Sequence, residues 1–420
     1  MRWFPIKSTA VVATLSLIIL LAGASAAADH GKILYAFNGN DGADPNGGLI
    51  SDANGNLYGT TYAGGTSGAG VIFEVVSPAD GGWKLRVLHN FSDNAPDGGN
   101  PTAGLILDRH GNFYGTTFKG GAAGLGTVFE LSCSSIGHWT EHVLYSFQGN
   151  SGGANPYAGL VMDSLGNIYG TTLGGGNSGE DCESSGCGTV FQLAPTSTGW
   201  QETILYKFTD NGVDGINPTS GLILDQAGNL YGDTASGGSS GAGTVFELTS
   251  QSGEWVENIL HSFAVNGVDG IAPSGPLVFD ASGNLYGLTF RGGAYGGYGY
   301  GYGTAFELSP GSDGWTETIL FNFGGTTELP TGPAVFDARG NIYGVAVGAY
   351  PYAPAIVFEL TPWEGSWSEA VLGGFAAGNV ASGALLLDKA ANIYGALGDG
   401  GPKNDGAVYE LTGRGYNASF

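Results

Sequence analysis

The sequence predicts an all-β fold, a seven-bladed β-propeller with four antiparallel strands per blade. Charged residues make up only 12% of the chain and Gly contributes 79 of 420 residues. This composition disfavours helices, because glycine costs about 1 kcal/mol per helical position. One heptapeptide, GNLYGTT at residues 55–61, appears seven times in related forms. Its copies lie 51 to 62 residues apart, a period typical of propeller blades.

Each repeat divides into four runs of strand length. The first run, GLILD at 221–225, is apolar on both faces, as expected for a strand between packed blades. The second is NLYGTT, and the third is GTVFEL, as at 243–248. Short runs rich in β-branched and aromatic residues predict strands. Copies of the fourth run, ETILYKF in one repeat, stand at 33–37, 86–91, 142–147, 202–208, 257–263, 317–323 and 369–375.

The position of the fourth run predicts how the ring closes. The copy at 33–37 precedes every first run. The last repeat contains runs at 383–387, 392–397 and 406–411 but no fourth run. We therefore expect the N-terminal strand to complete the last blade, since an open edge would leave backbone groups unpaired. The predicted domain is a single propeller over residues 32–420.

The turn between the first and second runs is Asp-x-x-Gly-Asn, as in 225–229. Asp accepts hydrogen bonds from the backbone that follows it, and Gly adopts a positive φ, so the turn forms a tight hairpin. This Asp occurs in all seven repeats, and the Glu of the third run occurs in six. Seven symmetric carboxylates do not make one acid/base pair, so we expect them to be structural.

The N-terminus has the pattern of a signal peptide. Arg2 and Lys7 precede an apolar run at 9–22 that is too short to span a membrane, and Ala24-Ser25-Ala26 is a cleavage signature. The prediction is a signal peptide over 1–26 and a secreted protein, periplasmic or extracellular.

The chain is strongly acidic, with 37 Asp and Glu against 13 Lys and Arg and a net charge of −24. Such a charge repels nucleic acids and anionic lipids. We expect a monomer that binds no nucleic acid and does not insert into membranes.

The repeat unit GLILDxxGNLYGTTxxGGxxGxGTVFEL resembles the bacterial GloVer repeat, found in choice-of-anchor tandem repeat GloVer-containing proteins. The likeness covers nearly the whole mature chain. The last two repeats differ, because Val345-Ala346 and Ala396-Leu397 replace the Thr pair. The resemblance implies an exported bacterial protein. It brings no known activity and no established catalytic residues.

The long connections predict a binding face. In a four-stranded blade, the fourth-to-first and second-to-third connections leave from one face, and both are long in this chain. The segment RGGAYGGYGYGYG at 291–303 differs most from its counterparts. Exposed aromatic rings can stack on sugars or anchor a protein partner; a Gly-rich loop without ligand is the alternative. Our candidate ligand-binding residues are five from this loop and two further residues found in one repeat each: Tyr295, Tyr298, Tyr300, Tyr302 and Arg291, with Asp233 and Glu328.

The fourth-to-first connections are dense in Asp, Asn and Gly. Ca²⁺ prefers oxygen ligands of this kind, although ordinary turns have the same composition. The candidate Ca²⁺ ligands are Asp210, Asp214, Asp93 and Asp97.

We expect the cysteines and two of the histidines to have structural roles. Cys182 and Cys187, five residues apart, are expected to form a disulfide after export, with a zinc site as the weaker alternative. Cys133 is expected to be a partly buried thiol. His89 and His261 occupy the Tyr position of the fourth run and are expected to be packing variants.

These patterns predict a binding or interaction module for a carbohydrate or a surface protein. One alternative is a polysaccharide-cleaving enzyme, a lyase or glycosidase, on the same face. A second is a structural protein of the cell envelope. No Ser/His/Asp order, phosphate loop or metal motif is visible, so the sequence predicts no catalytic residues.

Overall fold

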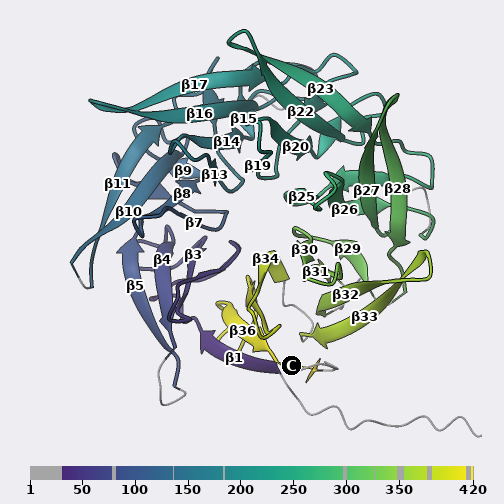
Figure 1. Ribbon diagram of the computed structural model, residues 1–420. Helices are drawn as coiled ribbons and strands as arrows, with labels where there is room; N and C mark the ends of the chain where they lie inside the picture. Colours follow the sequence, from purple (N-terminus) through teal and green to yellow (C-terminus); the bar gives the residue numbers. More distant parts are fainter. Residues whose placement is uncertain are drawn as a thin grey trace, which may run out of the picture.

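The computed structural model of the 420-residue chain is the predicted propeller, a closed ring of seven four-stranded antiparallel sheets (Figure 1). No helix occurs among the described residues, and none of them forms a segment able to cross a membrane as a helix. The predicted signal peptide, 1–26, lies outside the described residues. The structure describes residues 31–77, 82–135, 137–182, 185–296, 300–325, 327–347, 354–375, 381–412 and 418–419.

Blades 1 to 4 each contain four strands, numbered here from the central axis outward. Blade 1 is β2 (Ile50–Ser51), β3 (Leu57–Thr61), β4 (Val71–Val76) and β5 (Lys84–Asn90). Blade 2 is β7 (Ile106–Leu107), β8 (Phe113–Thr117), β10 (Thr127–Ser135) and β11 (His138–Ser146). Blade 3 is β13 (Val161–Met162), β14 (Ile168–Thr172), β16 (Thr189–Thr196) and β17 (Gly199–Lys207). Blade 4 is β19 (Ile223–Leu224), β20 (Leu230–Thr234), β22 (Thr244–Gln251) and β23 (Glu254–Ser262).

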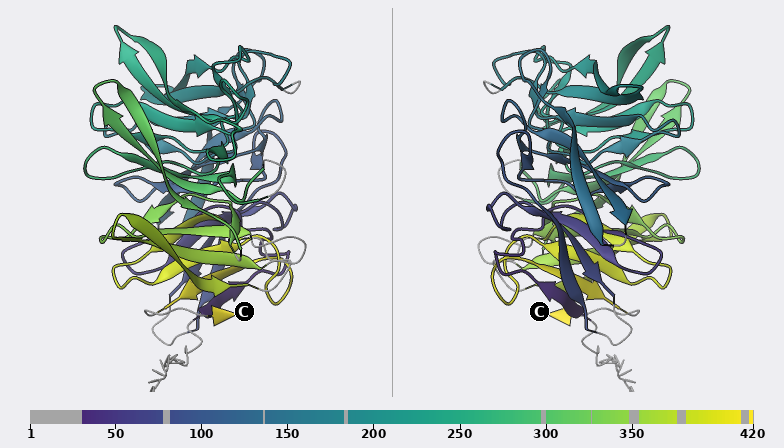
Figure 2. Two further views of the ribbon diagram at one scale, coloured as in Figure 1. Left: turned by 90° about the vertical axis from the view of Figure 1, so that its right-hand side faces the viewer. Right: turned by 90° about the vertical axis from the view of Figure 1, so that its left-hand side faces the viewer.

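Blades 5 to 7 continue the ring, and the side views show the blades next to one another with loops on both rims (Figure 2). Blade 5 is β25 (Val278–Phe279), β26 (Leu285–Gly292), β27 (Thr304–Gly311) and β28 (Gly314–Asn322). Blade 6 is β30 (Val335–Phe336), β31 (Ile342–Val347), β32 (Ala355–Trp363) and β33 (Ser366–Gly374), with β37 (Ala418–Ser419) parallel to β33. Blade 7 is β34 (Ala381–Leu387), β35 (Ile393–Leu397), β36 (Ala407–Leu411) and β1 (Gly31–Ala36).

The innermost strands of blades 1 to 6 are shorter than the five-residue runs expected from the sequence, because only two residues of each pair with the next strand. The blades converge at the axis, so the first half of each run packs against its neighbour. A Cβ on Gly104 would lie 2.6 Å from the carbonyl oxygen of Gly48 in the adjacent run. Small residues are therefore needed there.

The ring closes as predicted. β1 pairs antiparallel with β36, with Ile33 opposite Tyr409 and Tyr35 opposite Val408. Beyond the paired strands, the Phe37 amide donates to the Gly406 carbonyl at 3.1 Å. The two ends of the propeller sequence thus share one sheet, and the outer edge of blade 7 is covered.

One aromatic pair packs at every junction between blades. The last Phe of each outer strand meets an aromatic ring of the third strand of the next blade, with ring centroids 4.6 to 5.3 Å apart. At the closure this pair is Phe37 and Phe73, both fully buried. The glycine of each Tyr-Gly makes room for the third-strand ring, since a Cβ on Gly59 would lie 2.7 Å from Cζ of Phe73. This contact explains why the Tyr-Gly dipeptide recurs in every repeat.

The long connections pair with one another on one face, as the strand order requires. β6 (Gly98–Gly99) pairs with β9 (Lys119–Gly120), β12 (Gly153–Ala154) with β15 (Gly174–Gly175), and β18 (Gly215–Ile216) with β21 (Ser236–Gly237). In blades 5 and 6, β24 (Gly270–Pro273) and β29 (Glu328–Pro330) pair in the same way with β26 and β31. We call this the long-loop face.

Replacing Phe37 with Ala should lower the free energy of unfolding by about 3–5 kcal/mol, because it removes a fully buried ring from the closing junction. Chemical denaturation followed by Trp fluorescence measures the change. Lys32→Ala on the exposed side of the same strand is the control and should change stability by less than about 0.5 kcal/mol. Equal stability of Phe37→Ala and the unsubstituted protein would contradict closure by β1.

Candidate functional site

The carboxylates repeated in every blade are structural, as expected. In blade 1, Asp52 Oδ1 accepts from the amides of Asn54 and Asn56, both at 2.9 Å. The Tyr58 hydroxyl donates to Glu74 at 3.0 Å and contacts Asp52 at 3.3 Å. Burial alone would raise the pKa of Asp52, but hydrogen bonds from Asn56 and Asn54 lower it below its usual value. These groups stabilise the hairpin, and their hydrogen bonds within the blade occupy the carboxylate oxygens.

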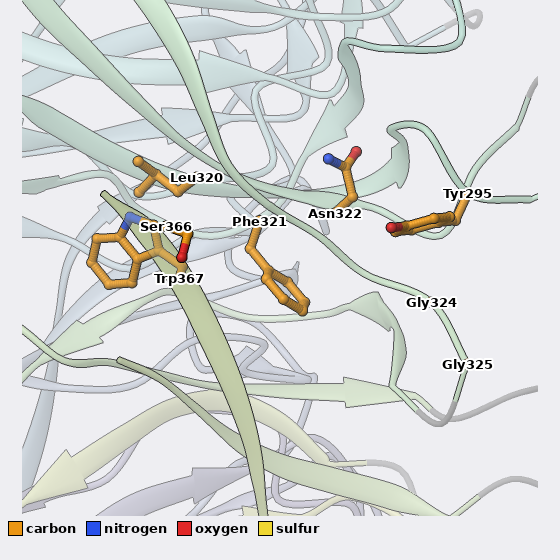
Figure 3. Close-up of a pocket in the computed structure, with 8 residues that line it drawn as sticks. All are labelled: Tyr295, Leu320, Phe321, Asn322, Gly324, Gly325, Ser366 and Trp367. Atoms are coloured by element: carbon orange, nitrogen blue, oxygen red, sulfur yellow. The ribbon is translucent and has the colours of Figure 1, made fainter. Parts of the chain in front are cut away.

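A groove lies between the outer strands of blades 5 and 6 (Figure 3). Its volume is about 520 Å³, within the range of small-ligand sites. In Figure 3, Trp367 and Leu320 lie toward one end, Phe321 in the middle, and Asn322 and Tyr295 toward the other end. The lining residues are Tyr295, Leu320, Phe321, Asn322, Gly324, Gly325, Ser366 and Trp367.

Departures from the repeat occur in the segments that line this groove. The connection after β28 is short: Pro330 follows Phe323 by seven residues, whereas Pro273 follows Phe263 by ten. The loop between β26 and β27 is long. The two Thr residues that flank it, Thr289 and Thr304, are 15 positions apart, whereas the equivalent Thr residues of blade 4 are 10 positions apart. The short connection brings Gly324 against the ring that the long loop supplies, because a Cβ there would lie 3.2 Å from Cβ of Tyr295.

The groove combines aromatic surface with uncharged polar groups. Tyr295 is 59% exposed, so its ring is available to a ligand. Asn322 Oδ1 accepts from the Ala294 amide at 2.7 Å, which holds the side chain and leaves its NH₂ group as a donor. Ser366 adds a hydroxyl oxygen as an acceptor, because its proton is donated to the Trp363 carbonyl at 2.9 Å. None of the eight lining residues carries a charge, so the groove suits a neutral ligand.

The Tyr-rich loop divides its predicted residues between different environments. Tyr295 lines the groove, whereas Tyr300, 61% exposed, has the Arg291 guanidinium 5.6 Å from its ring centre. Tyr302 is partly buried and packs against the core between blades 5 and 6. Tyr298 lies outside the described residues.

Asp233 and Glu328, which we expected to face a ligand, do not line this groove. Asp233 lies within β20 at the position of Thr60, whose hydroxyl donates to the next blade. Its side chain is therefore enclosed between blades and only 1% exposed. Burial raises the pKa of Asp233 to about 7. Glu328 is 8% exposed because β29 pairs with β31 around it.

A second cavity, of about 780 Å³, occupies the centre of the ring. Its wall is formed by the starts of the first runs, including Ala103, Gly159 and Ser220, with Tyr157 and Phe290 also on the lining. Its lining residues include no carboxylate, imidazole, amine or guanidinium group. Tyr157, 45% exposed, is a candidate contact for a ligand entering this channel.

The four candidate Ca²⁺ ligands are not brought together. Asp97 accepts from the amides of Ser92 and Gly98 at 2.9 and 2.8 Å. Asp214 accepts from the Tyr206 hydroxyl at 3.0 Å. Asp210 accepts from the Asp181 amide at 3.0 Å. Asp93 has φ of 53°, and its amide donates to the Gly98 carbonyl. Turn chemistry accounts for these contacts.

Sequence reasoning missed a set of partly buried glutamates between blades. Each follows a Trp by two residues at the start of an outer strand, and this repeated Trp-x-Glu could have revealed them. Burial raises the pKa of Glu141 to about 7 and, together with the neighbouring Asp214, that of Glu257 to about 8. The five residues are Glu141, Glu202, Glu257, Glu317 and Glu369, and each has one buried oxygen without a hydrogen-bond partner among the described residues.

Cys182 and Cys187 form a disulfide, with Cα atoms 4.7 Å apart. The Cys187 amide donates to Asn177 and its carbonyl accepts from Asn217, so the bridge ties the long loop of blade 3 to the next connection. Cys133 is exposed rather than partly buried, because it lies toward the tip of the β10–β11 hairpin.

The sequence matches the Gloeobacter/Verrucomicrobia repeat over residues 24–182 and 140–326. The chain belongs to this GloVer repeat family. The match ends before the two GloVer repeats in which neither Thr of the pair remains, which form blades 6 and 7. Comparison with curated proteins gave no match.

Solved propeller structures resemble the whole ring. A polysaccharide lyase of family PL25, an ulvan lyase bound to -[GlcA(1-4)Rha3S]-, has a TM-score of 0.56 at 12% identity, covering 91% of this chain and 96% of the lyase. A fungal alcohol oxidase of the AA5 family, in complex with copper, has a TM-score of 0.53 at 17% identity, covering 91% of this chain and 76% of the oxidase. At these identities the likeness is one of fold.

Asp233→Thr should be more stable than the unsubstituted protein at neutral pH. Burial raises the pKa of Asp233 from 3.8 to about 7, so the native state keeps a proton that the unfolded chain loses between these values. The contribution of this group to the free energy of unfolding is therefore greatest below pH 4. It falls by about 1.4 kcal/mol per pH unit until pH 7.

Urea unfolding at pH 4, 5.5, 7 and 8 measures this effect. The advantage of Asp233→Thr should grow up to pH 7 and then stay constant. Asp313→Asn, at an exposed turn, is the control and should leave the pH dependence unchanged. The same pH dependence in Asp233→Thr and the unsubstituted protein would show that Asp233 is not held as a neutral acid.

Proposed function

We propose that this exported GloVer propeller binds a neutral carbohydrate in the groove between blades 5 and 6. The observation that carries the proposal is the combination of aromatic rings, an amide donor and a hydroxyl in a groove without charged groups. Sugar rings present C–H groups to aromatic faces and hydroxyls to amides. Tyr295 and Trp367 would supply the faces, and Asn322 and Ser366 the hydrogen bonds.

The charge of the protein narrows the ligand class. With a net charge of −24 and no cation among the groove residues, the protein would repel a uronate or sulfated chain. The ligand of the PL25 lyase contains a uronic acid and a sulfate, so we expect a different substrate class here. Neutral glucans, mannans and galactans are the appropriate first probes.

Cleavage is the alternative that the experiment must separate. A lyase or glycosidase needs an acid and a base at the scissile bond. In this groove Tyr295 is the only titratable side chain among the eight lining residues. Incubation with the bound polysaccharide, followed by size analysis, should therefore release no shortened chains. Shortened chains would show that the protein is an enzyme and would contradict a binding-only role. Absence of both binding and cleavage would favour a structural role in the envelope.

Tyr295→Ala should weaken binding of the neutral polysaccharide by about tenfold, or about 1.4 kcal/mol. Tyr is among the residue types enriched in contacts whose truncation costs more than about 1 kcal/mol. Tyr295→Phe keeps the ring and should bind normally. Tyr157→Ala, in the central channel, is the matched control and should also bind normally. Isothermal titration calorimetry measures all three. If only Tyr157→Ala lost binding, the ligand would bind in the central channel and not in the groove.

A further inference from the structure

Equivalent polar clusters lie at several junctions between blades, built from three positions. The first, which we call the outer-strand aromatic position, lies two residues before the last Phe of each outer strand. The second is an Asp in the connection that follows, and the third is the Glu of Trp-x-Glu in the next blade. The outer-strand aromatic position is Tyr35, His89, Tyr145, Tyr206, His261, Phe321 or Gly373.

At the one Tyr junction that has both the Asp and the Glu, hydrogen bonds join the cluster. Between blades 3 and 4 the Tyr206 hydroxyl lies 3.0 Å from Asp214 Oδ2 and 2.8 Å from Glu257 Oε2. The hydroxyl donates its proton to one carboxylate, and Glu257 keeps a proton for the other contact, because burial and the neighbouring Asp214 raise its pKa to about 8. The junction therefore needs no further group.

Where the position is His, the geometry changes. His261 Nε2 lies 3.4 Å from Asp269 Oδ2 and 3.6 Å from Glu317 Oε2, and it is buried without a hydrogen-bond partner among the described residues. Charge-assisted N–H···O bonds are about 2.7–2.9 Å long. A separation of about 3.3 Å is instead the edge of a tetrahedron of N and O ligands around Zn²⁺, whose bonds are about 2.0–2.2 Å long.

The cluster is also held in place for a ligand. Asp269 Oδ2 accepts from the Ala264 amide at 2.8 Å and Oδ1 from the Gly270 amide at 2.7 Å, so the carboxylate cannot turn away. Such outer contacts orient metal ligands in known sites. Two carboxylates facing each other at a buried junction also favour a cation between them.

The second His cluster repeats the arrangement between blades 1 and 2. His89 Nε2 lies 3.3 Å from Asp97 Oδ1, and Glu141 completes the set. Among the described residues, these two clusters are the only groups of three or more such side chains whose ligand atoms lie within 4.8 Å of one another. Both occur at junctions where His replaces Tyr.

We propose that His261, Asp269 and Glu317 bind a divalent transition metal ion, Zn²⁺ by the nature of the ligands, and that His89, Asp97 and Glu141 form a second site. One nitrogen and two carboxylate ligands leave the fourth position of a tetrahedral ion to water. Each ion joins the outer strand of one blade to that of the next, β23 to β28 and β5 to β11 (Figure 1). At these two junctions, the coordinated ion links the groups that hydrogen bonds of the Tyr206 hydroxyl link between blades 3 and 4.

The full chain is equilibrated with micromolar Zn²⁺ at pH 7.5, dialysed, and analysed for bound metal by mass spectrometry. We expect two Zn²⁺ per chain, one in His261→Tyr, one in His89→Tyr and none in the double variant. The Tyr substitutions reproduce the Tyr206 junction, so these proteins should fold normally. Zn²⁺ should raise the Tm of the unsubstituted protein, and EDTA should reverse the increase.

Further variants make the result decisive. Glu317→Gln should lose one ion without replacing the histidine, and Tyr206→His should gain a third site. His142→Gln, an exposed histidine on β11, is the control and should still bind two ions. The proposal is overturned if the unsubstituted protein binds no Zn²⁺, or if the double Tyr variant binds as much as the unsubstituted protein. Carbohydrate binding is measured separately and does not enter this test.

Discussion

The packing of one aromatic ring over a backbone without a side chain is the constraint on which this ring depends. The third-strand ring of each blade occupies the space above the glycine of Tyr-Gly and meets the last Phe of the preceding outer strand. A β-carbon at that glycine would displace the ring from the junction. Because the contact links neighbouring blades, it must be present seven times for the ring to close, and the chain keeps it even where the surrounding repeat has changed.

The repeat also shows where evidence for function should be sought. Asp52 and Glu74 recur with their hydrogen-bond partners in nearly every blade, so they belong to the scaffold. Changes at single junctions are different, because the scaffold does not require them. A short connection and a long loop open a groove between blades 5 and 6. Histidine at two outer strands lies beside two carboxylates, and at His261 the ring nitrogen is buried.

Sequence reasoning worked best for local contacts and for features that follow from the number of strands in each repeat. The Asp-x-x-Gly-Asn turns were predictable because each is closed by residues at most four positions apart. Closure by residues 33–37 followed from counting strands. We expected Asp233 on the binding face, and the structure encloses it between blades, because the register of β20 turns its side chain toward the neighbouring blade. Among the predicted residues that the structure describes, Tyr295 is the one that lines the groove.

By itself, the sequence determined the class of fold, the number of blades, the strand that closes the ring and the face that carries the long loops. These properties follow from periodicity and from hydrogen bonding within one repeat. Only the tertiary structure decided that Tyr295 shares a groove with Trp367, or that His261 faces Glu317. Those residues belong to different blades, and the distance between them depends on how two sheets twist and pack. No pattern within a single repeat encodes that distance.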